Sequence, residues 1–260
     1  MKFLHVTDTH LVAGNKLLYG LNPQERLRAC VDHINRQHAD AEFAVVTGDL
    51  TQSGDPAAYE LVRAILAQLK MPFHLMIGNH DDRSNFKAAF PDAPVDDNGF
   101  IQFSFDTSAG RFICLDTNEP GEPHGSFCTL RRNWLETQLA AAADKSVYLF
   151  MHHPPFTVGL RRMDEIMLLD SAAFTEIVAG RPNIKHLFFG HLHRPLSGSW
   201  RGIPFSNVLG TNHQVALDFE MEGIVPGSQE PPAYGVVFAK PELTLVHLCN
   251  FLDQTATFNL

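Results

Sequence analysis

Residues 186–193 read His-Leu-Phe-Phe-Gly-His-Leu-His, an apolar run that ends in a glycine and two histidines one residue apart. The run predicts a buried strand over 186–189. In an extended chain the side chains of residues i and i+2 point to the same side. Both imidazoles, His191 and His193, can therefore reach one target. A solvated loop would show the same spacing, so the choice depends on the rest of the chain.

Four further apolar runs alternate with amphipathic stretches. The runs lie at 3–6, 43–46, 73–77 and 147–151, and each enters a polar or glycine-bearing turn. The amphipathic stretches predict helices over 22–37, 55–70, 129–144 and about 170–180, and a hairpin is predicted from 100–106 and 111–116. Alternation of strands and helices predicts a mostly parallel sheet that is covered on both faces.

The sequence after residue 195 has a different pattern, with short strand-like pieces and no convincing helix. Short strand-like pieces occur at 196–200, 203–208, 234–239 and 243–249, while 221–233 has the composition of a loop. We expect an antiparallel second layer here. Our prediction is a single domain over 1–260, in which 195–260 completes the second sheet and contributes a surface for association into a homo-oligomer.

Composition limits the partners. The net charge of −9 and the pI near 5.8 argue against binding to nucleic acid polymers or to an anionic membrane. A small anionic substrate is still compatible with this charge, because metal ions can reverse the local field. The N-terminal sequence reaches charged residues at once, and no apolar run approaches about 20 residues. These features predict a cytoplasmic protein that does not span a membrane.

Polar residues with metal-binding chemistry follow all five predicted strands. In order they are Asp8-Thr9-His10, Gly48-Asp49, Gly78-Asn79-His80-Asp81, His152-His153 and Gly190-His191-Leu192-His193. Each one alone is a weak signal, because a strand-end Asp or Asn more often caps a turn. Capping would favour Ser and Thr equally, yet imidazole and carboxylate dominate. Because ligands bind at the carboxyl ends of strands in such sheets, the joint pattern predicts one site.

These five motifs, in this order over residues 3–195, resemble those of the calcineurin-like metallophosphoesterases. Within that family the chain is most similar to bacterial glycerophosphodiesterases and class III cyclic-nucleotide phosphodiesterases. The resemblance implies a four-layer α/β/β/α sandwich with mixed sheets and a metal site at the carboxyl ends of the strands.

The resemblance also implies two divalent metal ions and their ligands. One ion takes Asp8, His10, Asp49 and His193, and the other takes Asp49, Asn79, His152 and His191, so that Asp49 bridges the pair. Mixed imidazole and carboxylate ligation suits Mn, Fe, Co or Zn. The two histidines of the opening stretch would then serve different ions.

The same resemblance implies the roles of further residues. A water bridging the two ions would attack phosphorus. His80 would act as general acid or stabilise the charged transition state, or else only brace Asn79. We expect His153 to lie behind the ligands. Rim candidates for substrate contact are Arg161, Arg162 and His213, together with Asn79 and His80. His5 and His186 we interpret as satisfied core residues.

Four functions compete. The leading one is a metal-dependent hydrolase of small phosphodiesters, either glycerophosphodiesters or 3′,5′-cyclic nucleotides. A phosphomonoesterase or protein phosphatase of the same fold would need extra basic groups to grip a dianion, and the acidic net charge counts against a nuclease. The fourth is a non-enzymatic metal-binding scaffold; a metal-free scaffold on this fold would be expected to lose ligands, and all seven are present.

Overall fold

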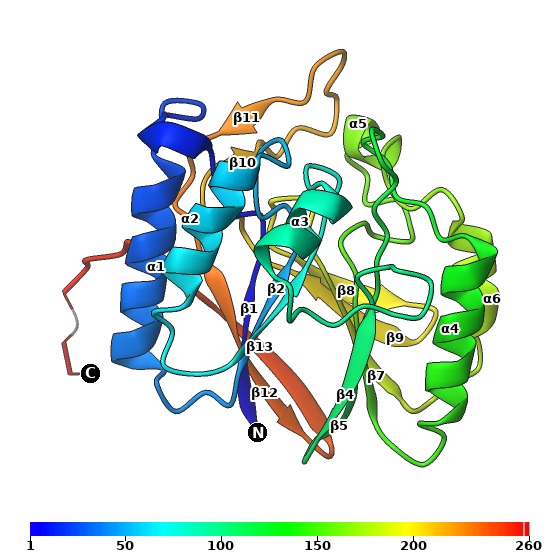
Figure 1. Ribbon diagram of the computed structural model, residues 1–260. Coiled ribbons are helices and arrows are strands. Elements are labelled where there is room, and N and C mark those ends of the chain that lie inside the picture. The colour runs from blue at the N-terminus through cyan, green and yellow to red at the C-terminus, as the bar shows by residue number, and fades with distance from the viewer. Residues whose placement is uncertain (257, 260) are drawn as a thin grey trace.

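The computed structural model describes residues 1–256 and 258–259. Two sheets lie face to face, with α1 and α2 outside one of them and α4 and α6 outside the other (Figure 1). The first sheet has the strand order β13-β12-β1-β2-β3. Its strands are β1 (Lys2–Val6), β2 (Ala44–Thr47), β3 (Phe73–Met76), β12 (Tyr234–Lys240) and β13 (Leu243–Cys249). Its covering helices are α1 (Pro23–Gln37), α2 (Pro56–Leu66) and α3 (Arg83–Ala89).

The second sheet has the strand order β4-β5-β6-β7-β9-β8. Its strands are β4 (Phe103–Thr107), β5 (Gly110–Cys114), β6 (Val147–Phe150), β7 (Ile184–Phe189), β8 (Leu196–Trp200) and β9 (Ile203–Asn207). It is covered by α4 (Thr129–Ala140) and α6 (Ser171–Val178). Short elements complete the chain: a 3₁₀ turn (Ala13–Asn15), α5 (Arg161–Asp164), β10 (Gln214–Val215) and β11 (Gly227–Ser228).

Strand alternation separates the three layers of core. In β1, Leu4 and Val6 pack toward the helices, whereas Phe3 packs between the sheets. The Phe3 ring contacts Phe150 and Phe188 of the opposite sheet edge-to-face, with ring centroids 5.9 and 5.6 Å apart. Aromatic pairs of this geometry add to the energy of burial, so this core fixes the two sheets, and their strand ends, against each other.

The predicted helices begin where they were expected, but some end earlier. Asn22 caps α1 by accepting from two backbone N–H groups, and Asp55 caps α2. Helix α2 ends at Leu66 rather than at residue 70, and α4 ends at Ala140 rather than at 144. The sequence did not predict α3, because its seven residues are too few to show a helical period.

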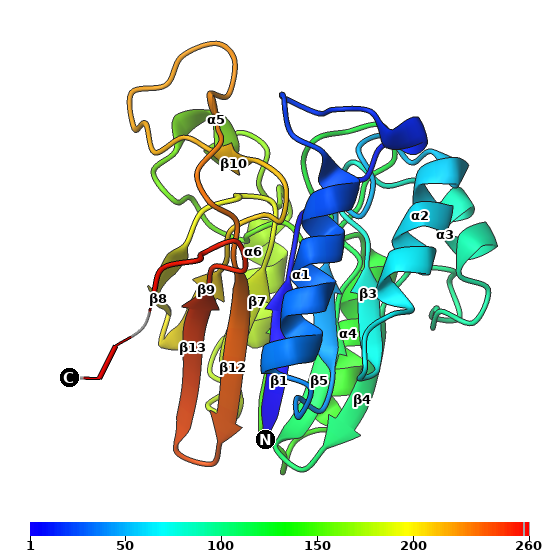
Figure 2. The same ribbon diagram turned by 90° about the vertical axis from the view of Figure 1, so that its left-hand side faces the viewer.

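The region after residue 195 departs from the expectation of one layer. Only β8 and β9 join the second sheet, where β9 pairs in parallel with β7. The hairpin β12–β13 instead joins the first sheet, antiparallel to β1, on the side away from β3 (Figure 2). The physical reason is that β1 is paired with β2 along one edge only, which leaves its other edge open to a strand.

None of the helices in the described part of the chain combines the length and the apolar character that a membrane crossing requires.

Candidate metal centre

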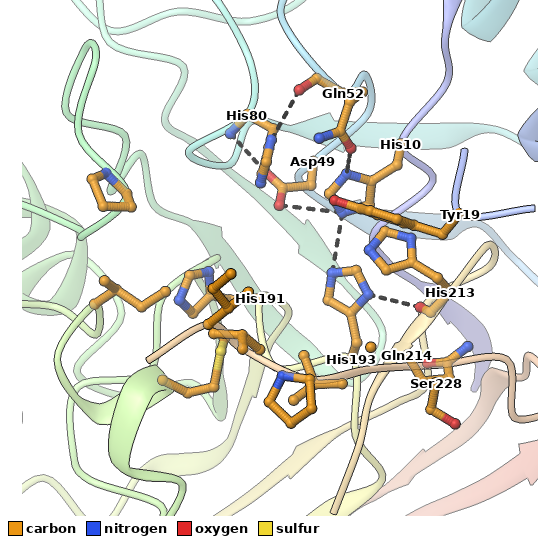
Figure 3. Close-up of a pocket in the computed structure, with 18 of the residues that line it drawn as sticks. His10, Tyr19, Asp49, Gln52, His80, His191, His193, His213, Gln214 and Ser228 are labelled. Atoms are coloured by element: carbon orange, nitrogen blue, oxygen red, sulfur yellow. Dashed lines mark hydrogen bonds and ion pairs between the residues drawn. The ribbon is translucent and has the colours of Figure 1, made fainter. Parts of the chain in front are cut away.

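The strand ends of both sheets meet at one pocket of about 500 Å³. Asp8 and His10 follow β1, Asp49 follows β2, and Asn79 and His80 follow β3. From the second sheet, His152 follows β6, and His191 and His193 follow β7. Figure 3 shows His80 and Asp49 on one side of the pocket, with His191 and His193 facing them. The sequence expectation that these ends converge is confirmed.

Several of these residues have a left-handed backbone. The φ angles of Asp8, His10, Asp49, His191 and His193 are 53°, 46°, 49°, 69° and 48°. Such angles are uncommon outside glycine and cost about 1–3 kcal/mol each, and they cluster at functional sites. The segment 191–193 is therefore a tight turn and not an extended chain. Our reason for expecting its two histidines to point the same way was wrong, because turn geometry, not strand alternation, aims them.

One cluster of potential ligand atoms comes from four residues. Side-chain nitrogen and oxygen atoms of Asp8, His10, Asp49 and His193 lie within 4.8 Å of one another. Asp8, His10 and Asp49 are at most 1% exposed, and His193 is 4% exposed. Two carboxylates and two imidazoles, removed from water and held this close, are the donors that divalent transition metals prefer.

The hydrogen bonds of the two imidazoles leave bare nitrogens inside this cluster. His193 Nδ1 lies 2.8 Å from the carbonyl oxygen of His213, so Nδ1 carries the hydrogen that it donates. His10 Nδ1 lies 2.9 Å from Gln52 Oε1, which also accepts. A neutral imidazole has one N–H, so each Nε2 presents a lone pair. These two Nε2 atoms are 3.1 Å apart and need a cation between them.

The second cluster follows the same logic. His152 Nδ1 donates to the carbonyl oxygen of Thr47 at 2.7 Å, so in the neutral ring Nε2 carries a lone pair. This Nε2 faces two acceptors, Asp49 Oδ2 at 3.3 Å and Asn79 Oδ1 at 3.2 Å. His191 Nδ1 lies 3.0 Å from the same Asn79 oxygen. Acceptors that face acceptors in a buried site are stabilised by a shared cation.

The electrostatics of the bare side chains agree with a cation site. Burial alone would lower the pKa of His152, but the Asp49 carboxylate outweighs it and raises that pKa to about 9. Burial likewise opposes ionisation of Asp8, yet the His193 imidazole lowers the pKa of that carboxyl below its usual range. Protons thus occupy the positions between these donors when no metal is present, and a divalent ion would replace them.

Gly78 permits this close packing. A Cβ at residue 78 would lie 2.2 Å from Asp49 Oδ1 and 2.6 Å from the His152 ring. Only glycine allows the third strand-end turn to pass so near the ligands.

His80 lies beside the clusters. Its backbone N–H donates to Asp49 Oδ1 at 2.9 Å, and its ring Nδ1 donates to the carbonyl oxygen of Gln52 at 2.9 Å. The side chain lines the pocket and is half-buried. His153 is fully buried and does not line the pocket; its Nδ1 lies 2.8 Å from Thr117 Oγ1.

The rim candidates separate into two groups. His213 lines the pocket, with its ring centroid 4.9 Å from that of His10 and 4.7 Å from that of His193. The structure does not bring Arg161 or Arg162 into the pocket lining. They pair with the acidic residues Glu222 and Glu165 on the exposed surface, because α5 turns its charged side outward.

Sequence reasoning missed one wall of the pocket. Tyr19, Gln52, Met163, Ile166 and residues 224–229 line it as well. The Tyr19 ring lies 4.7 Å from the His213 ring, on the same side of the pocket as His10 (Figure 3). Of these residues, Gln52 carries a positional signal, since it follows the Gly48-Asp49 turn by three residues. Met163 lies in α5 beside the rim candidates Arg161 and Arg162, and Ile166 follows that helix, so the sequence located this segment but not the side chains that face the pocket. Tyr19 and residues 224–229 lie in loops and in the short strand β11, and their composition does not point to a site.

Two mixed sheets between helices, with imidazoles and carboxylates at their shared strand ends, define a binuclear centre for divalent metals. The chain belongs to the calcineurin-like phosphoesterase family, whose model matches residues 1–195. Membership makes it a phosphoester hydrolase.

Relatives cover nearly the whole chain. It is 46% identical over 263 residues to a probable cyclic nucleotide phosphodiesterase from Rhodopseudomonas palustris, covering 100% of this chain and 96% of the relative. It is 30% identical over 236 residues to a probable glycerophosphodiester phosphodiesterase from Arcobacter nitrofigilis, covering 90% and 86%. The fold is similar to that of a dimetal phosphatase from Danio rerio, with a TM-score of 0.71, 15% identity, and coverage of 97% and 96%.

Proposed function

We propose that the chain hydrolyses small phosphodiesters that carry one negative charge, either 3′,5′-cyclic nucleotides or glycerophosphodiesters. The observation that carries this proposal is the pair of clusters in which bare imidazole nitrogens face carboxylate and amide oxygens at one pocket. The names of the two relatives support a diester substrate of one of these classes.

A charge count supports a monoanionic substrate. Two divalent ions bring four positive charges, and Asp8 and Asp49 return two negative ones, while neutral imidazoles and an amide add none. A hydroxide and one diester monoanion balance the remainder. Among the described residues, the pocket lining contains no Lys or Arg, and Tyr19, Gln52, Met163 and Ile166 are among its members. The described lining therefore offers no guanidinium or ammonium group for the second negative charge of a phosphomonoester dianion.

The bound metal pair supplies an acidified water as nucleophile and positive charge for the phosphoryl oxygens. Asp8, His10, Asp49 and His193 would hold one ion, and Asp49, Asn79, His152 and His191 the other. The nitrogen-rich donor set favours Mn, Fe, Co or Zn.

The position of His80 suits it to donate a proton. Because Nδ1–H donates to the Gln52 carbonyl oxygen, Nε2 is the atom that is free to hold a second proton. We propose that Nε2 gives this proton to the leaving alkoxide. The backbone N–H of His80 occupies Asp49 Oδ1, which leaves Oδ2 facing His152 and the ligand cluster. One residue would thereby position the carboxylate that borders both clusters and serve the leaving group.

Activity measurements after loading with Mn(II) test the proposal. The panel compares bis(p-nitrophenyl) phosphate, p-nitrophenyl phosphate, 3′,5′-cyclic AMP and glycerophosphodiesters, with Asp49→Asn as the inactive control. We expect turnover of the diesters, and loss of turnover after chelation. A higher kcat/KM for p-nitrophenyl phosphate than for the aryl diester would contradict a diesterase and favour a phosphomonoesterase.

We also infer that the chain self-associates through β13. This strand ends the first sheet, and its Leu243, Leu245 and Leu248 side chains are 40–48% exposed. An apolar edge strand favours pairing with another copy. Sedimentation equilibrium at micromolar concentration tests this inference, and a monomer would refute it.

A further inference from the structure

A buried series of hydrogen bonds connects His5, near the end of β1, to Asp8. His5 Nε2 lies 2.9 Å from Thr47 Oγ1. Thr47 Oγ1 donates to Thr7 Oγ1 at 2.8 Å, and Thr7 Oγ1 donates to Asp8 Oδ2 at 2.7 Å. All four residues are 0% exposed. We call this series the His5 relay.

The direction of every bond in the His5 relay is determined by chemistry. The Asp8 carboxylate can only accept, so the single O–H of Thr7 is used on it. Thr47 must then donate to Thr7, which leaves its own oxygen to accept from His5 Nε2–H. Burial lowers the pKa of His5 to about 3, so the ring is neutral and carries one hydrogen. That hydrogen lies on Nε2, in agreement with an Nδ1 that has no partner among the described residues.

The far end of the relay sets the orientation of Asp8. With Oδ2 held by Thr7, the other oxygen, Oδ1, turns toward the first ligand cluster. It lies 3.3 Å from His193 Nε2 and accepts from the backbone N–H of His191 at 3.2 Å. The left-handed backbone of Asp8 is unfavourable by itself. Contacts such as these are therefore needed to hold it.

The motif Gly190-His191-Leu192-His193 leaves space for the relay. A Cβ at Gly190 would lie 2.3 Å from Thr7 Oγ1, so the glycine before His191 leaves room for the hydroxyl. Thr47 also contributes twice, because its carbonyl oxygen accepts from His152 Nδ1. One strand end thus orients a donor in each of the two clusters.

We propose that the His5 relay is a positioning device for metal binding: it fixes Asp8 so that Oδ1 alone points to the metal. His5, Thr47 and Thr7 act through Asp8 and do not touch metal or substrate. The inference rests on the ligand role proposed for Asp8. Losing an outer partner of a metal ligand typically lowers metal affinity by about 10- to 100-fold.

His186 provides a matched control. It lies in the neighbouring sheet on β7, is 6% exposed, and has its Nε2 2.9 Å from a hydroxyl, that of Ser206. Its Nδ1 also lacks a partner among the described residues. Both His5 and His186 rings pack against Phe188, at 5.5 and 4.3 Å between centroids. The Ser206 hydroxyl, however, makes no hydrogen bond to a ligand within the residues described.

The test measures Mn(II) affinity and the Mn(II) electron paramagnetic resonance spectrum of full-length variants, with no substrate. We expect Thr7→Val to weaken one of two Mn(II) ions by about 10- to 100-fold and to change its spectrum. Thr7→Ser, which keeps the hydroxyl, should stay within about threefold of the parent, well below that range. His186→Phe should leave affinity unchanged even where it lowers Tm.

His5 variants decide the matter if Thr7→Val does not fold. His5→Gln keeps a donor near the position of Nε2 and should retain affinity, whereas His5→Leu should lose it to the same extent as Thr7→Val. Equal affinity in His5→Leu and His5→Gln would overturn the proposal, as would an equal loss in His186→Phe. A parent protein that binds two Mn(II) but cleaves no diester would refute the proposed function and leave this inference standing.

Discussion

The ligand clusters and the outer wall of the pocket are built in different ways. In the clusters, Asp8 and His152 are 0% exposed, and a hydrogen bond of 2.7 Å holds the side-chain atom that does not face the proposed metal, Oδ2 of Asp8 and Nδ1 of His152. We define the outer wall as Tyr19, Met163, Ile166 and residues 224–229. There Tyr19 is 63% and Ile224 is 91% exposed. The clusters sit on strand ends of two sheets, whereas the wall sits mainly on loops.

The difference indicates a division of labour. Donors that must converge within 4.8 Å need a rigid frame, and the aromatic core between the sheets supplies it. We expect the wall to contact only the organic part of a substrate, where small shifts in geometry would be tolerated. Loops on a rigid scaffold commonly carry such variable contacts. Substitutions in the clusters should therefore affect the chemistry, and substitutions in the wall should affect substrate preference.

The largest effect is expected for Asp49→Asn. Asp49 Oδ2 lies 3.5 Å from His10 Nε2 and 3.3 Å from His152 Nε2, so this carboxylate borders both clusters. In the proposed ligand scheme, its removal would deprive both ions of a negative ligand. We expect kcat on every diester to fall by more than about 10⁴-fold, beyond the usual contribution of one positioned acid. Metal analysis together with steady-state kinetics checks this prediction.

A moderate loss that excess Mn(II) restores would contradict a shared carboxylate. It would indicate that Asp49 serves one ion only, and that the clusters are independent.

The next largest effect is expected for His80→Ala. The side chain lies outside the ligand clusters, so both metals should stay bound. The rate on alkyl diesters should fall by about 10²–10⁴-fold, because an alkoxide needs a proton to leave. A p-nitrophenolate leaves without one, so aryl diesters should lose least. Parallel kinetics on an aryl and an alkyl diester give the comparison.

Asn79→Ala is the control for His80. Its Oδ1 faces His152 and His191, so its loss should weaken one metal and slow all substrates alike, with partial recovery at high Mn(II). Equal losses on aryl and alkyl diesters in His80→Ala, with metals bound, would exclude the acid role. Loss of metal from His80→Ala would instead indicate that it only braces Asn79.

A pH dependence should belong to the clusters. In the metal-free chain Asp49 raises the pKa of His152 to about 9, although burial acts against it. This ion pair stabilises the metal-free fold fully below pH 6.5, the unfolded value, and the contribution is lost as pH rises through 9. Mn(II) must displace the proton, so its affinity should rise by up to about tenfold per pH unit between 7 and 9. Calorimetry in buffers of different ionisation enthalpy measures the protons released, and an affinity independent of pH would contradict this coupling.

The contrast between ligand clusters on strand ends and an outer wall on loops also explains which site residues the sequence could predict. Asp8, His10 and Asp49 directly follow apolar runs, so their convergence follows from strand geometry. The two strands of the hairpin β12–β13 were predicted, but we assigned them to the wrong sheet. The sequence of a strand does not show which sheet has an unpaired edge strand to which it can bind. Tyr19 and Ile224 reach the pocket through loops, where no period ties residue number to position. Arg161 failed as a rim candidate for a different reason, because α5 turns its charged side outward, where Arg161 pairs with Glu222.

The smallest effect is expected at the outer wall, for Tyr19→Ala. The ring rests on His213, and the Tyr19 carbonyl oxygen accepts from Gln229 Nε2 at 2.8 Å, which connects two loops of the wall. The substitution leaves this backbone contact and every ligand in place. A lost aromatic contact to substrate corresponds to about 1 kcal/mol, or several-fold in KM, with kcat unchanged. KM should rise more for 3′,5′-cyclic AMP than for a glycerophosphodiester, since only the nucleotide has a flat base to stack. A fall in kcat without a change in KM would place Tyr19 with the catalytic clusters and break the division between the two regions.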